Sequence, residues 1–313
     1  MDDPLRVIAG ADGVFLRREV LGCGFDDKMI RRMVRARLWH RVRQGAYCFE
    51  DVWAASTAEE RHLILARAVL RTTPGPVALS HTTALIVHGI AVWGADLTKV
   101  HVTRLDDGAG RRERDVTHHV GLVLDGDMVE IAGLPVVSPG RAVVEAATVM
   151  SLESALVSAD SALHRRHCHP DELHRLFGRM NHWPGSQRVH VVLHHMDGRA
   201  ESPGETRARF MFWRFHVPVP DLQFKVYDEC GRLVAVTDFV WHAHRRFGEF
   251  DGAVKYGRTY LREGETPSDV VVNEKKREDL VRGITGYGCS RLMWPELSRP
   301  GETSARFRRE LGL

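Results

Sequence analysis

The segment Leu233–Gly252, LVAVTDFVWHAHRRFGEFDG, decides how the last third of this 313-residue chain is interpreted. Its two apolar stretches, 233–239 and 247–250, predict two neighbouring β-strands. Each stretch carries a carboxylate near its end, Asp238 in the first and Glu249 in the second. Acidic side chains rarely enter apolar strands unless a cation binds them, and Mg²⁺ held by carboxylate and phosphate oxygens is the usual case. The segment therefore predicts a metal site suited to phosphodiester chemistry.

Two further carboxylates extend this set. Glu205 lies in a predicted helix, 205–215, that precedes the strands. Asp251 follows Glu249 by two residues, so on one strand both side chains point to the same face, as a shared ion requires. The competing interpretation is that Asp251 and Gly252 form a turn and that Glu249 is a surface carboxylate, because Asp-Gly is a frequent turn dipeptide.

Helices and strands alternate around this segment and along the rest of the chain. This order predicts an α/β fold of the mixed α+β kind. We expect three parts: a DNA-binding domain at 1–50, a mixed α+β middle region at 51–199, and a nuclease-like α/β domain at 200–313.

Composition limits the class of protein. An apolar content of 43% and a charged content of 27% are ordinary for a globular chain, and the net charge of +3 does not by itself indicate nucleic acid. The five cysteines are scattered and form no CxxC pair, which favours a reducing compartment. No apolar run approaches the ~20 residues that cross a bilayer, so we expect a cytoplasmic protein without membrane contact.

The first fifty residues contain a strongly basic segment. Between Lys28 and Arg43 there are seven Lys or Arg residues and no Asp or Glu. Asp26 is suited to cap a helix that runs to about Arg37. At 100° per residue, basic and apolar side chains lie on opposite faces of this helix. The basic face consists of Lys28, Arg31, Arg32 and Arg35, and the apolar face of Met29, Ile30, Met33 and Val34.

Two strand-like stretches, 39–43 and 45–49, follow the basic helix. Helix, turn, helix and hairpin is the order of a winged helix-turn-helix. In such a domain the basic face enters the major groove, while Arg41 and Arg43 on the hairpin contact the flanking phosphates. The competing interpretation is a solvated basic face without a ligand.

These first fifty residues resemble the N-terminal winged-helix domain of the AbiEi-type antitoxins of type IV toxin–antitoxin systems. The likeness rests on Gly13-Val14, Gly24-Phe25 and 38–47, and 79–84 and 134–141 look like the segment that follows this domain in actinobacterial members. The resemblance implies that the chain binds double-stranded DNA, takes part in transcription regulation at its own promoter, and has a cognate toxin protein as partner.

The last hundred residues resemble the nuclease-like domain related to very-short-patch-repair endonucleases, within the PD-(D/E)XK superfamily. The matching positions are 201–205, 218–220, Gln223, Asp238, 249–252, Lys276-Arg277, Leu280 and Tyr287-Gly288. The resemblance implies Mg²⁺-dependent hydrolysis of DNA. It gives Glu205, Asp238, Glu249 and Lys255 as catalytic residues, and Asp238, Glu249 and Asp251 as metal ligands.

One position departs from the superfamily pattern. Asp251 stands where the pattern has lysine, and Lys255, four residues further on, can take that role. The repair endonucleases use a nearby histidine instead, but none lies between Glu249 and Gly264. The chain is therefore either an antitoxin or transcriptional regulator with a degenerate nuclease-like domain, or an active Mg²⁺-dependent endonuclease targeted by its winged helix. A protein-binding scaffold is the third alternative.

Two weaker patterns complete the set of candidate sites. His164, His167, Cys168 and His169 form a dense group of metal-ligand types, for which a polar helix end is the competing interpretation. Ser80 and His81 are a nucleophile and a base in sequence, but Ser80 is better suited to cap a helix.

Overall fold

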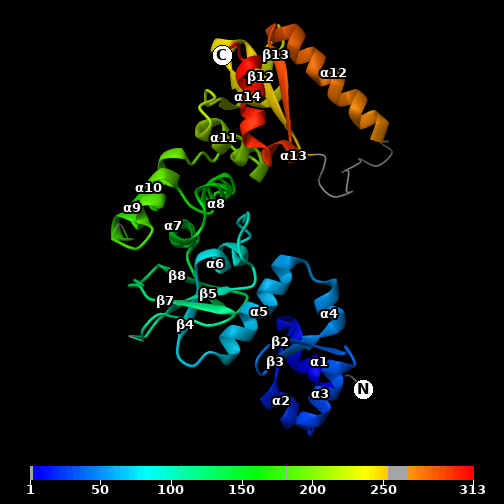
Figure 1. Cartoon of the computed structure of the whole chain (residues 1–313), viewed down its shortest axis with the longest axis vertical. Coiled ribbons are helices and arrows are strands. Elements are labelled where there is room, and N and C mark those ends of the chain that lie inside the picture. Colours follow the sequence, from blue (N-terminus) through cyan, green and yellow to red (C-terminus); the bar gives the residue numbers. More distant parts are fainter. Residues whose placement is uncertain (1–2, 107, 181, 253–266) are drawn as a thin grey trace. The chain divides into compact units, whose positions relative to one another are not determined.

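The computed structural model of the chain describes residues 3–106, 108–180, 182–252 and 267–313 (Figure 1). It contains helices and three separate sheets, which confirms the mixed α/β class. The chain divides into two compact units. The first comprises Met1–Ser158 and Arg166–His194, and the second comprises Ala159–Arg165 and His195–Leu313. Within the described residues, every helix is too short or too polar to cross a membrane.

The first unit begins with three short helices and a three-stranded sheet. The elements are α1 (Pro4–Ala9), a 3-10 turn η1 (Gly10–Asp12), β1 (Phe15–Leu16), α2 (Arg17–Gly22), α3 (Asp27–Arg35), β2 (Trp39–Arg43) and β3 (Ala46–Phe49). The sheet order is β1-β3-β2, with both pairs antiparallel. The predicted basic helix and hairpin are thus present, whereas the strand at Phe15 was not predicted because two residues show no periodicity.

An apolar core holds this first part together. Phe15 packs edge-on against Trp39 at 5.0 Å between ring centroids. Ile30 is the buried residue of α3 and joins the same cluster. The N-cap of α3 is Asp26, whose Oδ1 accepts a hydrogen bond from the Met29 amide at 2.7 Å. The apolar face of α3 therefore packs inward, which fixes the direction of its basic face.

A six-stranded mixed sheet forms the rest of the first unit, in the order β6-β7-β5-β4-β9-β8. Its strands are β4 (Val77–Leu79), β5 (Val100–Arg104), β6 (Arg111–Arg112), β7 (Val116–His119), β8 (Met128–Ile131) and β9 (Leu134–Val137). The accompanying helices are α4 (Glu50–Ala55), α5 (Ala58–Thr72), α6 (His81–Val87), α7 (Pro139–Val149), α9 (Pro170–Met180) and α10 (Ser186–His195), and α8 (Leu152–His164) leads from the first unit into the second.

Two element boundaries in this region have local causes. Helix α5 begins at Ala58, because Thr57 and Glu60 form a reciprocal capping box there. Helix α6 begins only at His81, because the three buried residues before Ser80 form β4, which pairs with β5 on one side and, through Leu79, with β9 on the other.

The second unit surrounds a four-stranded sheet, in the order β10-β11-β12-β13. Its elements are α11 (Pro203–Arg214), β10 (Asp221–Tyr227), β11 (Leu233–Trp241), η2 (His242–His244), β12 (Arg246–Asp251), α12 (Pro267–Thr285), β13 (Gly288–Met293), α13 (Trp294–Leu297) and α14 (Pro300–Glu310). The first three strands are antiparallel neighbours, while β12 and β13 run parallel and are connected through α12. Phe212, Phe239, Trp241 and Phe307 form an aromatic core between α11, α14 and the sheet.

Candidate functional site

Three of the predicted acidic residues lie on adjacent elements of the second unit. Asp238 lies in β11 and Glu249 in β12, and the register Phe239↔Gly248 places these two carboxylates opposite each other when it is continued by one residue. Directly opposite residues of an antiparallel pair project from the same face of the sheet. Asp238 Oδ2 accepts a hydrogen bond from the Phe250 amide at 2.7 Å, which orients this carboxylate at the end of the ladder.

Glu205 reaches the same group from the first turn of α11. Ser202 caps this helix, and its hydroxyl donates to Glu205 Oε1 at 2.7 Å. Glu205 Oε2 accepts from the Glu201 amide at 3.0 Å and from Gln223 Nε2 of β10 at 3.2 Å. Hydrogen bonds from both the helix and the sheet therefore fix the side chain of Glu205. The residue is only 5% exposed.

Burial and a neighbouring carboxylate shift the pKa values of this group. Burial, and next the charge of Asp238, raise the pKa of Glu205 to about 7. Burial also raises the pKa of Asp238, and the Phe250 amide and Arg277 act against this rise. A buried and a half-buried carboxylate with raised pKa values are an arrangement that a bound cation relieves.

Glu249 is held by a cation from α12. Arg277 Nη2 lies 2.6 Å from Glu249 Oε2, and Arg277 Nη1 donates to the Val236 carbonyl at 3.2 Å. Glu249 is 6% exposed, so it is a buried, paired carboxylate and not a surface one. In the sequence, Arg277 only supported the family resemblance; no local pattern indicated that it would contact Glu249.

The remaining predicted metal and catalytic residues are less closely placed. Asp251 is the last residue of β12 and pairs with Met293 of β13, so it is in a strand and not in the turn that Asp-Gly suggested. Lys255 lies outside the described residues. The oxygens of Glu205, Asp238 and Glu249 suit a hard cation such as Mg²⁺. Among the described residues they do not form a set of three ligand atoms within 4.8 Å, so sharing one ion requires them to approach.

A close fit between α11 and β12 sets the position of Glu205. Gly204 lies against the ring of Phe250, and a Cβ atom on Gly204 would be 2.1 Å from Phe250 Cε1. Only glycine permits this contact. The backbone of α11 therefore contacts β12 at Gly204. Gly204 precedes Glu205 in the chain, and Phe250 follows Glu249, so this contact holds the two acidic residues on adjoining elements.

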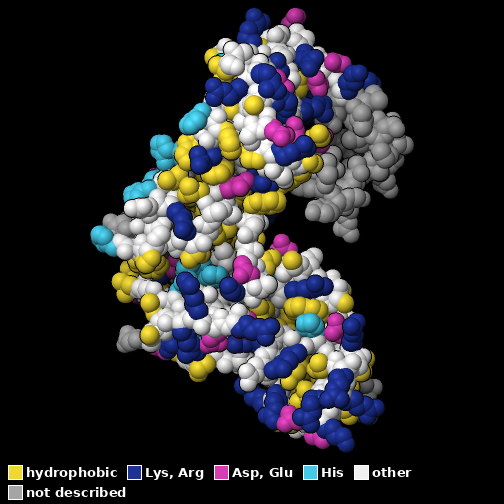
Figure 2. Space-filling view, viewed as in Figure 1, with side chains coloured by type: hydrophobic (Ala, Val, Ile, Leu, Met, Phe, Trp, Pro, Cys, Tyr) yellow, Lys and Arg dark blue, Asp and Glu magenta, His cyan; other side chains and the backbone are white. Residues whose placement is uncertain are grey.

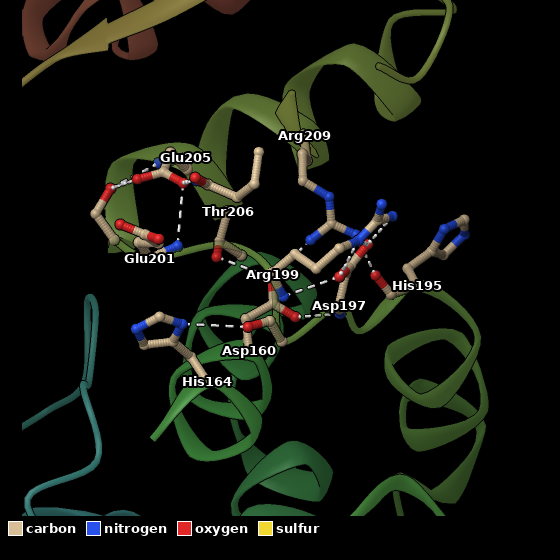
Figure 3. Close-up of polar contacts among 12 residues, drawn as sticks. Asp160, His164, His195, Asp197, Arg199, Glu201, Glu205, Thr206 and Arg209 are labelled. Carbon is tan, nitrogen blue, oxygen red and sulfur yellow. Dashed lines mark hydrogen bonds and ion pairs between the residues drawn. The ribbon is translucent and has the colours of Figure 1, made fainter. Parts of the chain in front are cut away.

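A buried ion pair anchors α11 on its other side (Figure 3). Asp160 Oδ2 accepts from Arg209 Nη1 at 2.7 Å and from the Thr206 hydroxyl at 2.8 Å, and Asp160 Oδ1 accepts from the Asp197 amide at 2.7 Å. Burial raises the pKa of Asp160 to about 7, against the effect of Arg209 and the other donors. Asp160 was missed from the sequence because its partners are about 40 to 50 residues away.

The basic residues of the first unit divide into two groups. Side chains of Lys and Arg gather over the N-terminal helices in the lower part of Figure 2. The four residues predicted for the basic face of α3 are all exposed, as is Arg41 of β2: Lys28, Arg31, Arg32, Arg35 and Arg41.

Arg43 has a different environment. Its guanidinium lies 3.1 Å from Asp115 and 3.3 Å from Glu113, and it donates to the Thr72 hydroxyl at 2.9 Å. The side chain is 13% exposed. Arg43 thus joins the hairpin to neighbouring elements of the first unit, a role that the count of basic residues in the sequence did not reveal.

The weaker sequence patterns have structural explanations. His164 Nδ1 contacts the Gly198 carbonyl at 3.2 Å, in agreement with a polar helix end. Ser80 occupies the N-cap position of α6, and both it and His81 are buried. The group of histidines that the structure does assemble is a different one, formed by His81, His101 and His119.

Comparisons with known proteins give relatives without an assigned activity. No family model matches the chain. The uncharacterised proteins MT2308 and Rv2248 of Mycobacterium tuberculosis are each 26% identical to it over 220 residues, which is 70% of this chain and 79% of the relative. The crystal structure of the RV2827C protein from Mycobacterium tuberculosis aligns with a TM-score of 0.38 and 16% identity, over 72% of this chain and 88% of that one.

Proposed function

We propose that this chain is a DNA-binding protein of the antitoxin or transcriptional-regulator type, in which α3 reads the major groove. The observation that supports this most directly is the two-sided character of α3. Ile30 is buried in the core, while the four basic residues of the opposite face are exposed. The order of three helices and a three-stranded sheet fits a winged helix, in which the third helix is the recognition helix.

The proposal assigns different tasks to the arginines. Arg31 and Arg35 are one helical turn apart, so both reach into the same groove. Arg41, exposed on the hairpin, contacts phosphate beside that groove. Arg43 supports the hairpin from the inside through its contacts with Glu113 and Asp115.

The test is fluorescence-anisotropy titration of the full chain with duplex DNA from its own promoter and with a scrambled duplex, at several salt concentrations. Arg31→Ala combined with Arg35→Ala is expected to weaken binding to the promoter and to reduce its preference over the scrambled duplex, by about 1–3 kcal/mol for each lost base contact. Arg41→Ala, which removes a phosphate contact, is expected to lower the salt slope by roughly 0.9. The matched control is Arg112→Ala with Arg175→Ala, which removes two exposed arginines from elsewhere in the first unit. Equal affinity of the α3 variant and the control would refute the assignment.

The family resemblance extends this proposal to a cognate toxin protein. The proposed toxin partner is supported by the same arrangement of N-terminal elements, so this extension depends on the DNA-binding proposal. Co-expression of the chain with the product of the neighbouring gene, followed by size-exclusion chromatography, tests it. Separate elution of the two proteins would remove the toxin from the proposal while leaving DNA binding intact.

A second candidate function is Mg²⁺-dependent cleavage of DNA by the second unit. The observation that favours it is the group formed by buried Glu205 and Glu249 and half-buried Asp238, in which Glu205 and Asp238 have raised pKa values. The order α11, three strands, α12 and β13 fits the nuclease-like domain of the PD-(D/E)XK superfamily. A bound Mg²⁺ would polarise a phosphoryl oxygen and lower the pKa of a bound water.

The chain's own residues have separate parts in this candidate. Asp238, fixed by the Phe250 amide, and Glu249 supply oxygen donors from adjacent strands. Arg277, which holds Glu249 at 2.6 Å, supplies a fixed cation in a domain where the usual lysine position is Asp251. Glu205, with a pKa of about 7, exchanges a proton near neutral pH.

Plasmid nicking with Mg²⁺ separates the two candidates. Wild type is compared with Asp238→Asn and with Glu302→Gln, a control that alters an exposed carboxylate of the same unit. If the chain is an active nuclease, the wild type and the Glu302 variant nick the plasmid and the Asp238 variant does not. Nicking by all three proteins, or by none of them, rejects the nuclease candidate and leaves the DNA-binding regulator.

A further inference from the structure

Three histidines from separate elements of the first unit meet on one face of the six-stranded sheet. His81 is the first residue of α6, directly after β4, while His101 lies in β5 and His119 ends β7. The parallel register pairs Thr103 with His119. Because residues two apart on a strand share a face, His101 and His119 project to the same side of the sheet.

The ring nitrogens are close enough to share an ion. One nitrogen of each ring lies within 4.8 Å of the other two. His101 Nδ1 and His119 Nε2 are 2.8 Å apart, and the rings of His81 and His119 stack at 3.6 Å between centroids. Two nitrogens on one tetrahedral zinc ion, each at about 2.05 Å, are about 3.3 Å apart. Widening the first contact by about half an ångström and tilting the stacked rings apart therefore accommodates an ion.

All three rings are in the form that binds metals. Burial lowers the pKa of His101 to about 4 and that of His119 to about 3, and it lowers the pKa of His81 well below its ordinary value. The imidazoles are therefore neutral at pH 7, and a neutral imidazole has a lone pair for a metal. His101 and His119 are half-buried rather than enclosed, which leaves a path for an ion.

A carboxylate supports the buried member of the group. Glu145 Oε2 lies 3.4 Å from His81 Nδ1, and the Ser80 hydroxyl lies 3.0 Å from the same nitrogen. Glu145 is itself fixed by Arg141, whose Nε donates to Glu145 Oε1 at 2.7 Å. A carboxylate behind a histidine orients the ring of a metal ligand and sets its tautomer. With Nδ1 engaged in this way, Nε2 of His81 is the nitrogen available to an ion.

The backbone at His81 gives an independent indication of a special role. Its φ is +50°, in the left-handed region that non-glycine residues rarely adopt. Such strain collects at sites where surrounding contacts hold a side chain for function. Here the strained residue is the one whose ring stacks on the His119 ring, and it lies at the junction of β4 and α6.

We propose that His81, His101 and His119 form a binding site for a divalent first-row transition-metal ion, represented by Zn²⁺. Imidazole nitrogens suit zinc, nickel, copper and iron, whereas carboxylate oxygens and water suit Mg²⁺. The site is thus chemically distinct from the carboxylate group of the second unit. On binding, the proton shared between His101 and His119 moves to the other nitrogen of its ring, and the ion takes its place.

The test uses the full chain stripped of metal with a chelator. Titration with Zn²⁺ by calorimetry and with Co²⁺ by absorption spectroscopy is expected to give one tight site whose Co²⁺ spectrum shows nitrogen coordination. His119→Gln abolishes this site. The matched control is His118→Gln, which changes the neighbouring buried histidine on the opposite face of β7, held by Glu113 at 3.2 Å. Asp238→Asn, which alters the carboxylate group, retains the site.

The possible outcomes are decisive. Zinc affinity that is equal in wild type and in the His119 variant overturns the proposal, as does equal loss in the His118 variant. Circular dichroism establishes that each variant is folded. If the His119 variant does not fold, the wild-type Co²⁺ spectrum decides: bands of a site with nitrogen ligands support the proposal, and their absence, or coordination by oxygen alone, refutes it.

Discussion

Replacing Asp160 by asparagine tests how strongly the buried ion pair stabilises the second unit. The substitution keeps the shape of the side chain but removes the charge that faces Arg209. It also turns an amide N–H₂ toward at least one of the three groups that donate to Asp160. The side chains of Asp160 and Arg209 are 1% and 9% exposed, so water cannot replace the lost contact.

The expected loss follows from this burial. Removing one partner of a buried pair costs about 3–5 kcal/mol, because the other charge remains buried without compensation. At about 3 °C per kcal/mol for a unit of this size, the midpoint of thermal unfolding falls by about 9–15 °C. The experiment is best done at pH 8, because Asp160 has a pKa of about 7 and is then ionised.

Differential scanning calorimetry, together with hydrogen exchange of the α11 amides, measures this effect. The control is Glu302→Gln, which removes an exposed carboxylate 3.9 Å from Arg299 and is expected to cost less than about 1 kcal/mol. A loss below about 1 kcal/mol in the Asp160 variant would refute the reasoning, since it would mean that the pair contributes no more than a surface contact.

Three further predictions concern other contacts. Arg43→Ala should lower the stability of the first unit by about 1–3 kcal/mol in urea unfolding while the Kd for DNA changes less than with Arg41→Ala, because Arg43 is bound internally. Burial lowers the pKa of His62, so its contribution is present above about pH 6.5 and lost as the pH falls below that value; His62→Gln should flatten the decline in unfolding free energy from pH 7 to 5. Gly204→Ala should cost about 1–3 kcal/mol in the same assay, whereas Gly283→Ala in α12, with open space around it, should be neutral or stabilising.

The sequence predicted elements whose signals are local. Asp26, the spacing of Ile30 and the glycine at position 45 are sufficient to indicate the basic helix and the hairpin, because caps, amphipathic periods and turns act over a few residues. The strands that carry Asp238 and Glu249 were recognised for the same reason.

The contacts that complete each site depend on tertiary structure. Arg277 reaches Glu249 across 28 residues, and Arg43 reaches Glu113 across 70. The three histidines of the first unit come from β5, β7 and the start of α6, and their doublet neighbour His118 projects to the other face. No pattern within one element contains this information, because it arises from the order of strands in the sheet.

The contact between Gly204 and Phe250 has a consequence for how this protein can evolve. A side chain at position 204 and an aromatic ring at position 250 compete for one volume. Substitutions at the two positions should therefore be coupled: an alanine at 204 becomes acceptable only after the residue at 250 has become smaller. Among diverging relatives, the residues at positions 204 and 250 should consequently change together. The packing of α11 against β12 would then be preserved even in relatives that have lost the acidic residues themselves.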